Sequence, residues 1–256
     1  MNAMVNITNK NLIFFQENGY LIKKNFVDCK LIEKLQGKVL EHLENRIAPF
    51  ELEQEVMYPG SPLTQSEIGG DTVRRLKLAY SRAKVFESWA ENEAVIAALK
   101  VLFQSDLLYL VQSHHNCIMT KQPQYSSETH WHKDTRYWNF ENNHLINTWL
   151  PLGDETIDNG CLQVIPKTHL WKTPVDRLDD KLFLRQDLYK NIPWIQNGIN
   201  VELQKGDLLF FHAALFHAAG RNNTKLSKNA VVFTYHSEKN KPLINTNSTK
   251  YSEISI

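Results

Sequence analysis

Residues 145–165 read LINTWLPLGDETIDNGCLQVI: an apolar run, a polar segment with turn residues, and a second apolar run. Within it, Asn159-Gly160 is a strong hairpin signal, because both residues tolerate the positive φ that tight hairpin turns require. We therefore expect two β-strands joined by a turn at this point of the chain.

Further short runs with the composition of strands lie on both sides of this segment, and turn residues separate them. With the two runs above, the candidates are residues 107–111, 116–121, 130–134, 145–152, 161–165, 198–203, 207–212 and 230–236. No helical pattern alternates with these strands, so a jelly roll or barrel is favoured over a parallel sheet built from βαβ units.

The first hundred residues have helical patterning instead. Thr8 or Asn9 is placed to cap a helix that Gly19 would end, and Asp28 precedes a long apolar stripe at helical spacing. We also expect helices over about residues 72–83 and 92–103, with a loop over 51–70. The segment 166–197 is too long for an ordinary connection, so it is either a cover over a binding cavity or a surface excursion.

The composition is that of one globular domain over residues 1–256, with 42% hydrophobic and 22% charged residues. We expect a helical part over about 8–104, a β core over about 106–236 and a polar tail over 237–256. The net charge of +1 gives no electrostatic signal for nucleic acid or an anionic membrane.

The three cysteines have no CxxC spacing, which argues against a disulfide framework and a thiolate zinc site. No apolar run reaches the roughly 18 residues of a membrane span, and the start lacks the pattern of a signal peptide. A cytoplasmic protein with a small-molecule partner is the expectation, and its oligomeric state stays open.

The histidines of the β half carry the first indication of chemistry. In His132-Lys133-Asp134, residues two apart on a strand face the same side at roughly 6–7 Å, a span that one metal ion can bridge. A distant histidine would complete the two-histidine, one-carboxylate triad of non-haem iron oxygenases. His212 and His217 are candidates, but their positions differ by five, so on one extended strand they would face opposite sides and only one can join the site.

Several ordered motifs resemble the phytanoyl-CoA dioxygenase family, which also contains the ectoine hydroxylases. Besides His132-Lys133-Asp134, the matching segments are Gly19-Tyr20, residues 121–123 (KQP), Trp149, residues 159–162 (NGCL), 166–169 (PKTH), 206–212 (GDLLFFH) and 217–222 (HAAGRN). The resemblance covers about residues 10–236.

The resemblance implies a mainly β fold, a double-stranded β-helix (jelly roll) with N-terminal helices packed on one sheet. It implies Fe(II) bound by His132, Asp134 and His217, with 2-oxoglutarate as co-substrate and O2 as oxidant. An Fe(II)- and 2-oxoglutarate-dependent dioxygenase would hydroxylate a small organic substrate and release succinate and CO2. Because the related halogenases lack this carboxylate, Asp134 favours hydroxylation.

The chain departs from the family pattern at the co-substrate. Where relatives carry an arginine eleven residues after the distal histidine, this chain has Lys228, a point charge in place of a planar fork. Arg221 is a competing candidate at a different spacing. Ala219 stands where relatives often have a serine that bonds the co-substrate.

Further residues are assigned by looser matches. Trp149 matches a tryptophan that lines the co-substrate pocket, and Arg74 falls where relatives place a basic residue; a core tryptophan and a solvated helix face are the alternatives. Arg136, Tyr137 and Trp138 follow the triad segment directly and would line the substrate cavity, unless they form a turn with packed aromatic rings.

Two other functions stay open from the sequence. The first is a jelly-roll protein that binds a small molecule and no longer catalyses a reaction. The second is a zinc-dependent hydrolase or isomerase that uses His130, His132 and His217.

Overall fold

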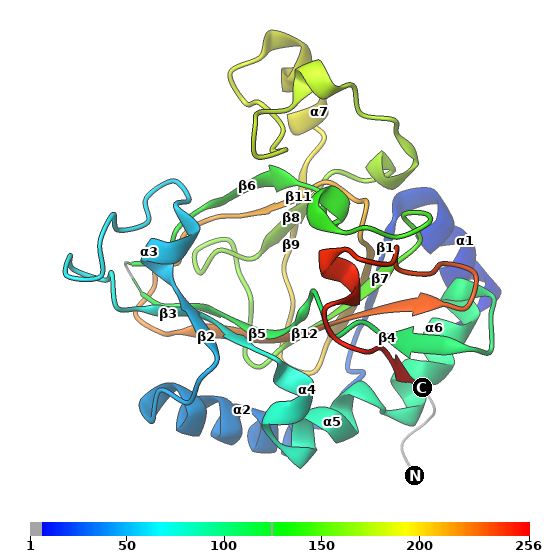
Figure 1. Ribbon diagram of the computed structural model, residues 1–256, viewed down its shortest axis with the longest axis horizontal. Coiled ribbons are helices and arrows are strands. Elements are labelled where there is room, and N and C mark those ends of the chain that lie inside the picture. Colours follow the sequence, from blue (N-terminus) through cyan, green and yellow to red (C-terminus); the bar gives the residue numbers. More distant parts are fainter. Residues whose placement is uncertain (1–6, 124) are drawn as a thin grey trace.

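Two antiparallel sheets face each other in the computed structural model of the protein, which describes residues 7–123 and 125–256 (Figure 1). The larger sheet has the order β1 (Tyr20–Lys23), β10 (Leu208–His212), β7 (Ile146–Pro151), β12 (Lys228–Ser237), β5 (Asn116–Lys121), β3 (Val73–Lys77) and β2 (Phe50–Leu52), with β4 (Leu108–Leu110) and β13 (Ile254–Ser255) joined beside β12. The smaller sheet has the order β6 (Thr129–His132), β11 (His217–Ala219), β8 (Leu162–Val164) and β9 (Ile199–Val201). This arrangement confirms the predicted jelly roll.

The helices of the described residues lie mostly in the first part of the chain. They are α1 (Asn9–Asn18), α2 (Cys29–Glu44), α3 (Glu53–Val56), α4 (Ala79–Arg82), α5 (Lys84–Ala90), α6 (Glu93–Phe103) and the late α7 (Ile192–Ile195). Short 3-10 turns are η1 (Asp134–Tyr137), η2 (Thr168–Leu170), η3 (Val175–Arg177), η4 (Tyr189–Asn191) and η5 (Asn247–Thr249). In Figure 1, α2, α4 and α5 lie beneath the larger sheet, while the segment with α7 projects above the smaller one.

The predicted helix ends are confirmed at α1 and α2. The Thr8 side chain accepts a hydrogen bond from the Asn11 amide, and Gly19 ends α1 with φ 79°. Asp28 caps α2 by accepting from the Lys30 amide at 2.7 Å. Each cap satisfies a backbone donor that the helix itself leaves unpaired.

The N-terminal helices pack on the outer face of the larger sheet, as expected. Leu35 of α2, Trp89 of α5 and Leu99 of α6 are fully buried with Ile118 and Phe233 of the sheet in one hydrophobic cluster. Full burial of such a side chain contributes about 1.5–3 kcal/mol. The opposite face of the same sheet forms the interior between the two sheets, so the helices leave that interior free for a site.

The expectation of a helix over residues 72–83 is wrong, because residues 73–77 form β3 and only 79–82 are helical. β3 pairs with β2 on one side and with β5 on the other, and these two ladders satisfy its backbone groups. The N-terminal part is therefore not purely helical, since β1, β2 and β3 all join the larger sheet. Long-range pairing has overridden the local pattern.

The predicted hairpin around Asn159-Gly160 is also wrong in one respect. The turn exists, with φ 74° at Gly160, but it links β7 in the larger sheet to β8 in the smaller sheet. β7 pairs with β10 and β12, whereas β8 pairs with β9 and β11. A Cβ on Gly160 would lie 2.4 Å from the Gly220 carbonyl oxygen, so this crossing between the sheets requires glycine.

Two further sequence expectations concern the whole chain. The three cysteines are free, as expected, with Cys117 and Cys161 buried. Among residues 7–123 and 125–256, no helix combines the length and hydropathy needed to cross a membrane.

Candidate active site

Two histidines face each other across neighbouring strands of the smaller sheet. His132 ends β6 and His217 begins β11, and the two residues are direct partners in the antiparallel register. Their ring centroids are 4.2 Å apart, and both side chains are buried. Two residues 85 positions apart in sequence are therefore brought together by strand pairing alone.

Backbone carbonyls fix the orientation of both rings. The Nδ1 atoms of His132 and His217 lie 2.8 Å from the His130 carbonyl oxygen and 3.0 Å from the Leu215 carbonyl oxygen. A carbonyl only accepts, so each Nδ1 carries a proton and Nε2 is the ring atom left to face the carboxylate. Both Nε2 atoms point toward Asp134, whose Oδ1 lies 3.6 Å from His132 and 3.4 Å from His217.

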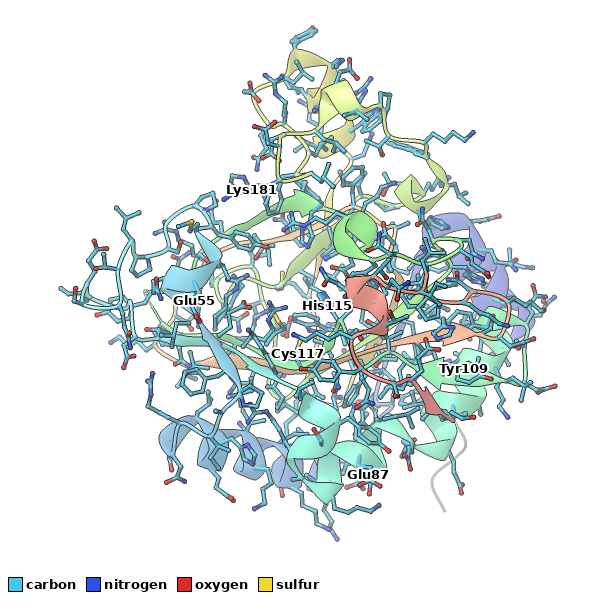
Figure 2. The ribbon with its side chains drawn as sticks, viewed as in Figure 1. Glu55, Glu87, Tyr109, His115, Cys117 and Lys181 are labelled. Atoms are coloured by element: carbon cyan, nitrogen blue, oxygen red, sulfur yellow. The ribbon has the colours of Figure 1, made fainter. Side chains whose placement is uncertain are left out.

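Asp134 does not continue β6 but begins η1. Its backbone amide donates to the Ala213 carbonyl oxygen at 2.9 Å, which connects η1 to the segment just before His217. Asn147 of β7 donates to Oδ2 at 2.6 Å, and the Nε2 atom of His115 lies 3.0 Å from Oδ1. Figure 2 shows His115 and Cys117 near the centre of the molecule, between the sheets. The carboxylate is thus held by contacts from both sheets.

The three side chains form a donor set for one metal ion. One ligand atom from each of His132, Asp134 and His217 lies within 4.8 Å of the other two, and all three residues are buried. Burial raises the pKa of Asp134, but the imidazoles of His217 and His115 outweigh this effect and keep the carboxylate ionised. Burial lowers the pKa of His132 to about 4, so this ligand is neutral. Two imidazoles and one carboxylate match the ligand set of non-haem Fe(II).

The remaining histidines of the sequence analysis stay outside this cluster. His212 stacks on His144 with centroids 5.7 Å apart and contacts His169 at 5.1 Å, away from the metal ligands. His130 is half-exposed beside Glu128 and is not part of the donor set found in the described residues. The alternative zinc site of His130, His132 and His217 is therefore not assembled in the part of the chain that the structure describes.

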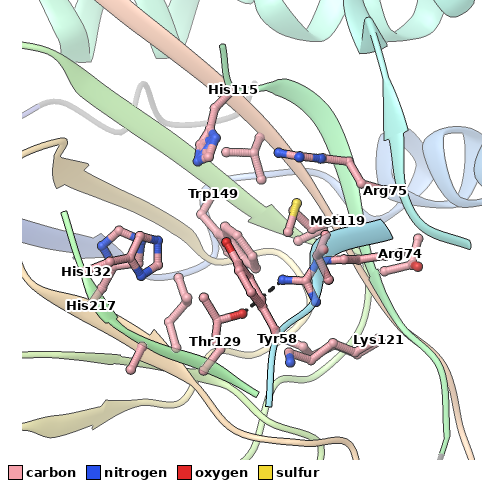
Figure 3. A pocket seen from close by; sticks show the side chains of 18 of the residues that line it. Tyr58, Arg74, Arg75, His115, Met119, Lys121, Thr129, His132, Trp149 and His217 are labelled. Atoms are coloured by element: carbon pink, nitrogen blue, oxygen red, sulfur yellow. Dashed lines mark hydrogen bonds between the residues drawn. The ribbon is translucent and has the colours of Figure 1, made fainter. Parts of the chain in front are cut away.

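An inner compartment extends from His132 and His217 into the space between the sheets (Figure 3). Its walls include Trp149, Phe211, Leu162, Ala219 and the basic side chains of Arg74, Lys121 and Lys228. Trp149, Arg74 and Lys228, assigned from sequence to the co-substrate, thus line one cavity with His132 and His217.

Two buried carboxylates neutralise part of this basic wall. Lys228 lies 3.1 Å from Glu155, whose other oxygen accepts from the Trp149 indole at 2.9 Å. Arg74 lies 3.4 Å from Glu53 and donates to the Ser127 and Thr129 hydroxyls at 2.7 and 3.0 Å. The three basic groups against two carboxylates leave one positive charge in excess.

Lys121 was not singled out for a charge role by the sequence, although it begins the family-like KQP segment. It ends β5, is only 8% exposed, and donates to the Ser127 carbonyl oxygen at 2.9 Å. Burial, followed by the charges of Arg74 and Lys228, lowers the pKa of Lys121 well below its usual range. An anion bound in the compartment would raise the pKa of Lys121 again, because its negative charge stabilises the ammonium form.

Arg221 lies elsewhere. It is exposed and packs against the loop at Gly60, and it does not line the inner compartment. Of the two sequence candidates for the far carboxylate of a co-substrate, only Lys228 reaches the cavity.

An outer compartment adjoins the inner one, and Glu51, Tyr58, Arg75, His115 and His132 line both. Arg136 and Trp138 line it together with His114, His115 and Tyr58. Arg136 donates to the Tyr58 hydroxyl at 2.9 Å, and Trp138 stacks on His114 with centroids 4.9 Å apart. The side chain of Tyr137, the third predicted lining residue, lies outside the described residues.

Phe183 of the long segment 166–197 packs against three residues that line this compartment. The Phe183 ring lies 5.6 Å from the His132 ring, 5.4 Å from the Tyr58 ring and 3.8 Å from the Arg136 guanidinium. Of the two sequence alternatives for this segment, the cover over a cavity is therefore the one that its contacts support.

Several residues of the site carry no local sequence signal. Asn147 and Glu155 look like ordinary polar residues beside β7, and Lys121 looks like a strand-end lysine. The alternation of side chains along β7 could have indicated Asn147, whereas nothing local distinguishes Lys121 and Glu155.

Comparisons with known proteins agree with this geometry. The family model Phytanoyl-CoA dioxygenase (PhyH) matches residues 15–230. Peroxisomal phytanoyl-CoA dioxygenase of Mus musculus is 25% identical over 232 residues, covering 85% of this chain and 65% of that protein. The probable phytanoyl-CoA dioxygenase of Caenorhabditis elegans is 25% identical over 239 residues, covering 87% and 73%. The chain thus spans about two thirds of the length of these curated relatives.

Solved structures share the fold. The non-heme alpha ketoglutarate dependent carbocyclase SnoK from nogalamycin biosynthesis superposes with a TM-score of 0.74 at 18% identity, covering 98% of this chain and 93% of SnoK. EctD from S. alaskensis, solved with 2-oxoglutarate and 5-hydroxyectoine, superposes with a TM-score of 0.73 at 16% identity, covering 94% and 79%.

Proposed function

The chain belongs to the phytanoyl-CoA dioxygenase family, and from this we propose that it is an Fe(II)- and 2-oxoglutarate-dependent dioxygenase that hydroxylates a small organic molecule. The observation that carries the proposal is the buried donor set of His132, Asp134 and His217, with a basic compartment beside it and a second compartment that adjoins the first. Such a set leaves half of an octahedral coordination sphere for other ligands.

In this proposal, His132 and His217 bind the iron through Nε2 and Asp134 binds it through Oδ1. Once bound, Fe(II) and 2-oxoglutarate supply the oxidising chemistry, with O2 as oxidant and succinate and CO2 as products. The protein contributes orientation and a fixed charge arrangement. The carbonyls of His130 and Leu215 hold the two imidazoles in one tautomer, and Asn147 holds the carboxylate.

The inner compartment would bind 2-oxoglutarate. Its far carboxylate would compensate the single excess positive charge of Arg74, Lys121 and Lys228, and Trp149 would form an apolar wall. Lysine in place of the family's arginine gives up the bidentate geometry. Lys121, which begins the family-like KQP segment, adds a second lysine to the same wall.

The outer compartment would bind the substrate, with Arg136 and Trp138 in its wall, and Tyr137 retained as a sequence-based assignment. The Phe183 ring lies 5.6 Å from the His132 ring and packs on Tyr58, and these two aromatic residues would help to exclude water from the reactive centre. The cytoplasmic location and the absence of nucleic-acid or membrane partners stay predictions from the sequence.

Succinate formation tests the proposal directly. Protein supplied with Fe(II), 2-oxoglutarate and O2 should form succinate, since these enzymes turn over slowly even without their substrate. His132→Ala and Asp134→Ala should abolish it. His144→Ala is the matched control, because His144 lies on the surface, outside the donor set.

The result that contradicts the proposal is equal succinate formation by the wild-type protein and both ligand variants. A wild-type protein that binds 2-oxoglutarate but forms no succinate and takes up no oxygen would instead favour the non-catalytic binding protein.

A further inference from the structure

We propose that the substrate is an anionic small molecule, whose acidic group, a carboxylate or a phosphate ester, is bound in the outer compartment by Arg136 and the basic side chains beside it. This inference rests on the proposed function, because it identifies the outer compartment as the substrate side of the metal.

The charges of the compartment wall are the first argument. Arg75, Lys77, Arg136 and Lys250 contribute four basic groups. Only two carboxylates line the same compartment within the described residues, Glu51 and Asp134, and Asp134 belongs to the metal donor set. The wall therefore carries a positive excess even before the charge of a metal ion is added.

The single remaining carboxylate is shared between two of the basic groups. Arg75 contacts both oxygens of Glu51, at 2.8 and 2.6 Å, and Lys77 lies 3.5 Å from the same carboxylate. One negative charge thus faces two positive ones on β3. A ligand with an acidic group would restore the balance, whereas an ammonium group would be repelled.

The position of Arg136 is the second argument. It lies two residues after Asp134, at the end of the compartment next to the metal ligands. His132 and Asp134 of the donor set line the same compartment as Arg136. A substrate anchored here would present its neighbouring carbon atoms to the metal.

Neutral aromatic groups hold Arg136 in place. Its guanidinium donates to the Tyr58 hydroxyl at 2.9 Å and lies 3.8 Å from the centroid of Phe183. Tyr58 and Phe183 come from two different covering segments, so the guanidinium is oriented before a ligand arrives. Preorganised donors bind an anion without the cost of ordering them.

Aromatic rings form another part of the wall. Trp138 stacks on His114 with centroids 4.9 Å apart, and Tyr58 also lines the compartment. Burial lowers the pKa of His114 to about 4, so this ring is uncharged at neutral pH. The compartment therefore suits a ligand with one acidic group and an apolar or planar body.

Shape-matched probes test this inference under anaerobic conditions, with Fe(II) and 2-oxoglutarate present so that the inner compartment is filled. We would measure the binding of phenylacetate, phenyl phosphate and the neutral phenylacetamide by ligand-observed NMR. At least one acidic probe should bind about tenfold more tightly than the amide, since a charge-assisted hydrogen bond contributes about 1.5–3 kcal/mol. Whether the carboxylate or the phosphate binds better identifies the acidic group.

Substitutions locate the binding site. Arg136→Gln should weaken the preferred acidic probe about tenfold, and Arg136→Lys should retain part of the affinity because it keeps the charge. Arg177→Gln is the matched control, since its guanidinium lies over Trp194 at 4.0 Å and outside both compartments.

Two results overturn the inference. In the first, the protein binds the amide as tightly as both acids, or binds none of the three probes. In the second, the Arg136→Gln variant binds the preferred acidic probe as tightly as the wild-type protein. The visible charge-transfer band of Fe(II) with 2-oxoglutarate, measured in the same samples, distinguishes a failure of this inference from a failure of the proposed function. If the band forms and the acids are not preferred, only the inference fails; if no band forms, the proposed function fails with it.

Discussion

Replacing Lys121 with methionine isolates the charge balance of the inner compartment. Lys121, Arg74 and Lys228 face two buried carboxylates, Glu53 and Glu155, so the Lys121→Met variant has no excess positive charge. The far carboxylate of 2-oxoglutarate then enters a neutral wall and loses one charge-assisted hydrogen bond. Such a bond contributes about 1.5–3 kcal/mol, which weakens binding by about 10- to 150-fold.

The same substitution should leave the fold nearly unchanged. The Lys121 ammonium donates a hydrogen bond to the Ser127 carbonyl oxygen at 2.9 Å, and its charged form is already disfavoured by burial and by the two neighbouring cations. Methionine has a similar length and no charge to desolvate. We expect the free energy of unfolding to change by no more than about 1 kcal/mol.

Proton uptake gives this prediction a second, independent signal. Because the pKa of Lys121 is lowered in the empty compartment, the group is partly deprotonated at pH values above that lowered pKa. A bound carboxylate raises the pKa again, so 2-oxoglutarate binding takes up a proton there, up to one per molecule bound. The affinity of the wild-type protein should therefore fall as the pH rises through this range.

Anaerobic calorimetry in buffers of different ionisation enthalpy measures affinity and proton uptake together. The wild-type protein should take up protons on binding 2-oxoglutarate, and Lys121→Met should bind more weakly without that uptake. If Lys121→Met has the wild-type dissociation constant and proton uptake, the reasoning about this compartment is refuted.

Three further predictions test other parts of the molecule. Lys228→Met should destabilise the protein by about 3–5 kcal/mol, because it leaves the Glu155 carboxylate buried without its partner at 3.1 Å. In urea denaturation, the double variant with Glu155→Gln should recover most of the lost stability; no recovery would contradict the pairing. His115→Ala should weaken Fe(II) binding by about 10- to 100-fold in a chelator competition, because it removes the contact at 3.0 Å to the aspartate of the donor set; unchanged affinity would show that this contact does not orient the ligand. Gly160→Ala should lower the stability of the protein by at least about 1–3 kcal/mol, because φ at this position is 74° and the new Cβ would clash with a carbonyl oxygen. Gly37→Ala is the control: it has open space around it in α2 and should stabilise the protein by about 0.5–1 kcal/mol. Equal effects of the two substitutions in thermal unfolding would argue against the geometry of the crossing between the sheets.

Local patterns predicted much of the fold correctly. Thr8 and Asp28 cap helices as expected, because capping involves only neighbouring residues. The expected strands were found for the same reason, since each is a short apolar run between turn residues. β11 was missed because His217, Ala218 and Ala219 are too few to form a pattern.

The errors concern long-range pairing. The sequence around Asn159-Gly160 predicts a turn, but it does not specify that β7 and β8 belong to different sheets. Residues 73–77 were taken as helical because pairing with β2 and β5, which makes them a strand, depends on distant segments.

In the candidate site, too, some residues could be predicted from the sequence and others required the structure. His132 and Asp134 could be proposed as partners because they lie two positions apart, and His217 was identified through the family motif. Lys121 and Glu155 could not, since their importance comes from burial beside other charges, which no local pattern records. The metal ligands were thus accessible from the sequence, whereas the charge balance around them required the structure.

Anaerobic titration of the protein with Fe(II) and 2-oxoglutarate tests the central claim most directly, because it needs no knowledge of the substrate. The account predicts a visible charge-transfer band that saturates at one iron and one 2-oxoglutarate per chain, and that Asp134→Ala fails to form it. A correctly folded wild-type protein that develops no such band with both components present would contradict the assignment of His132, Asp134 and His217 as an iron site.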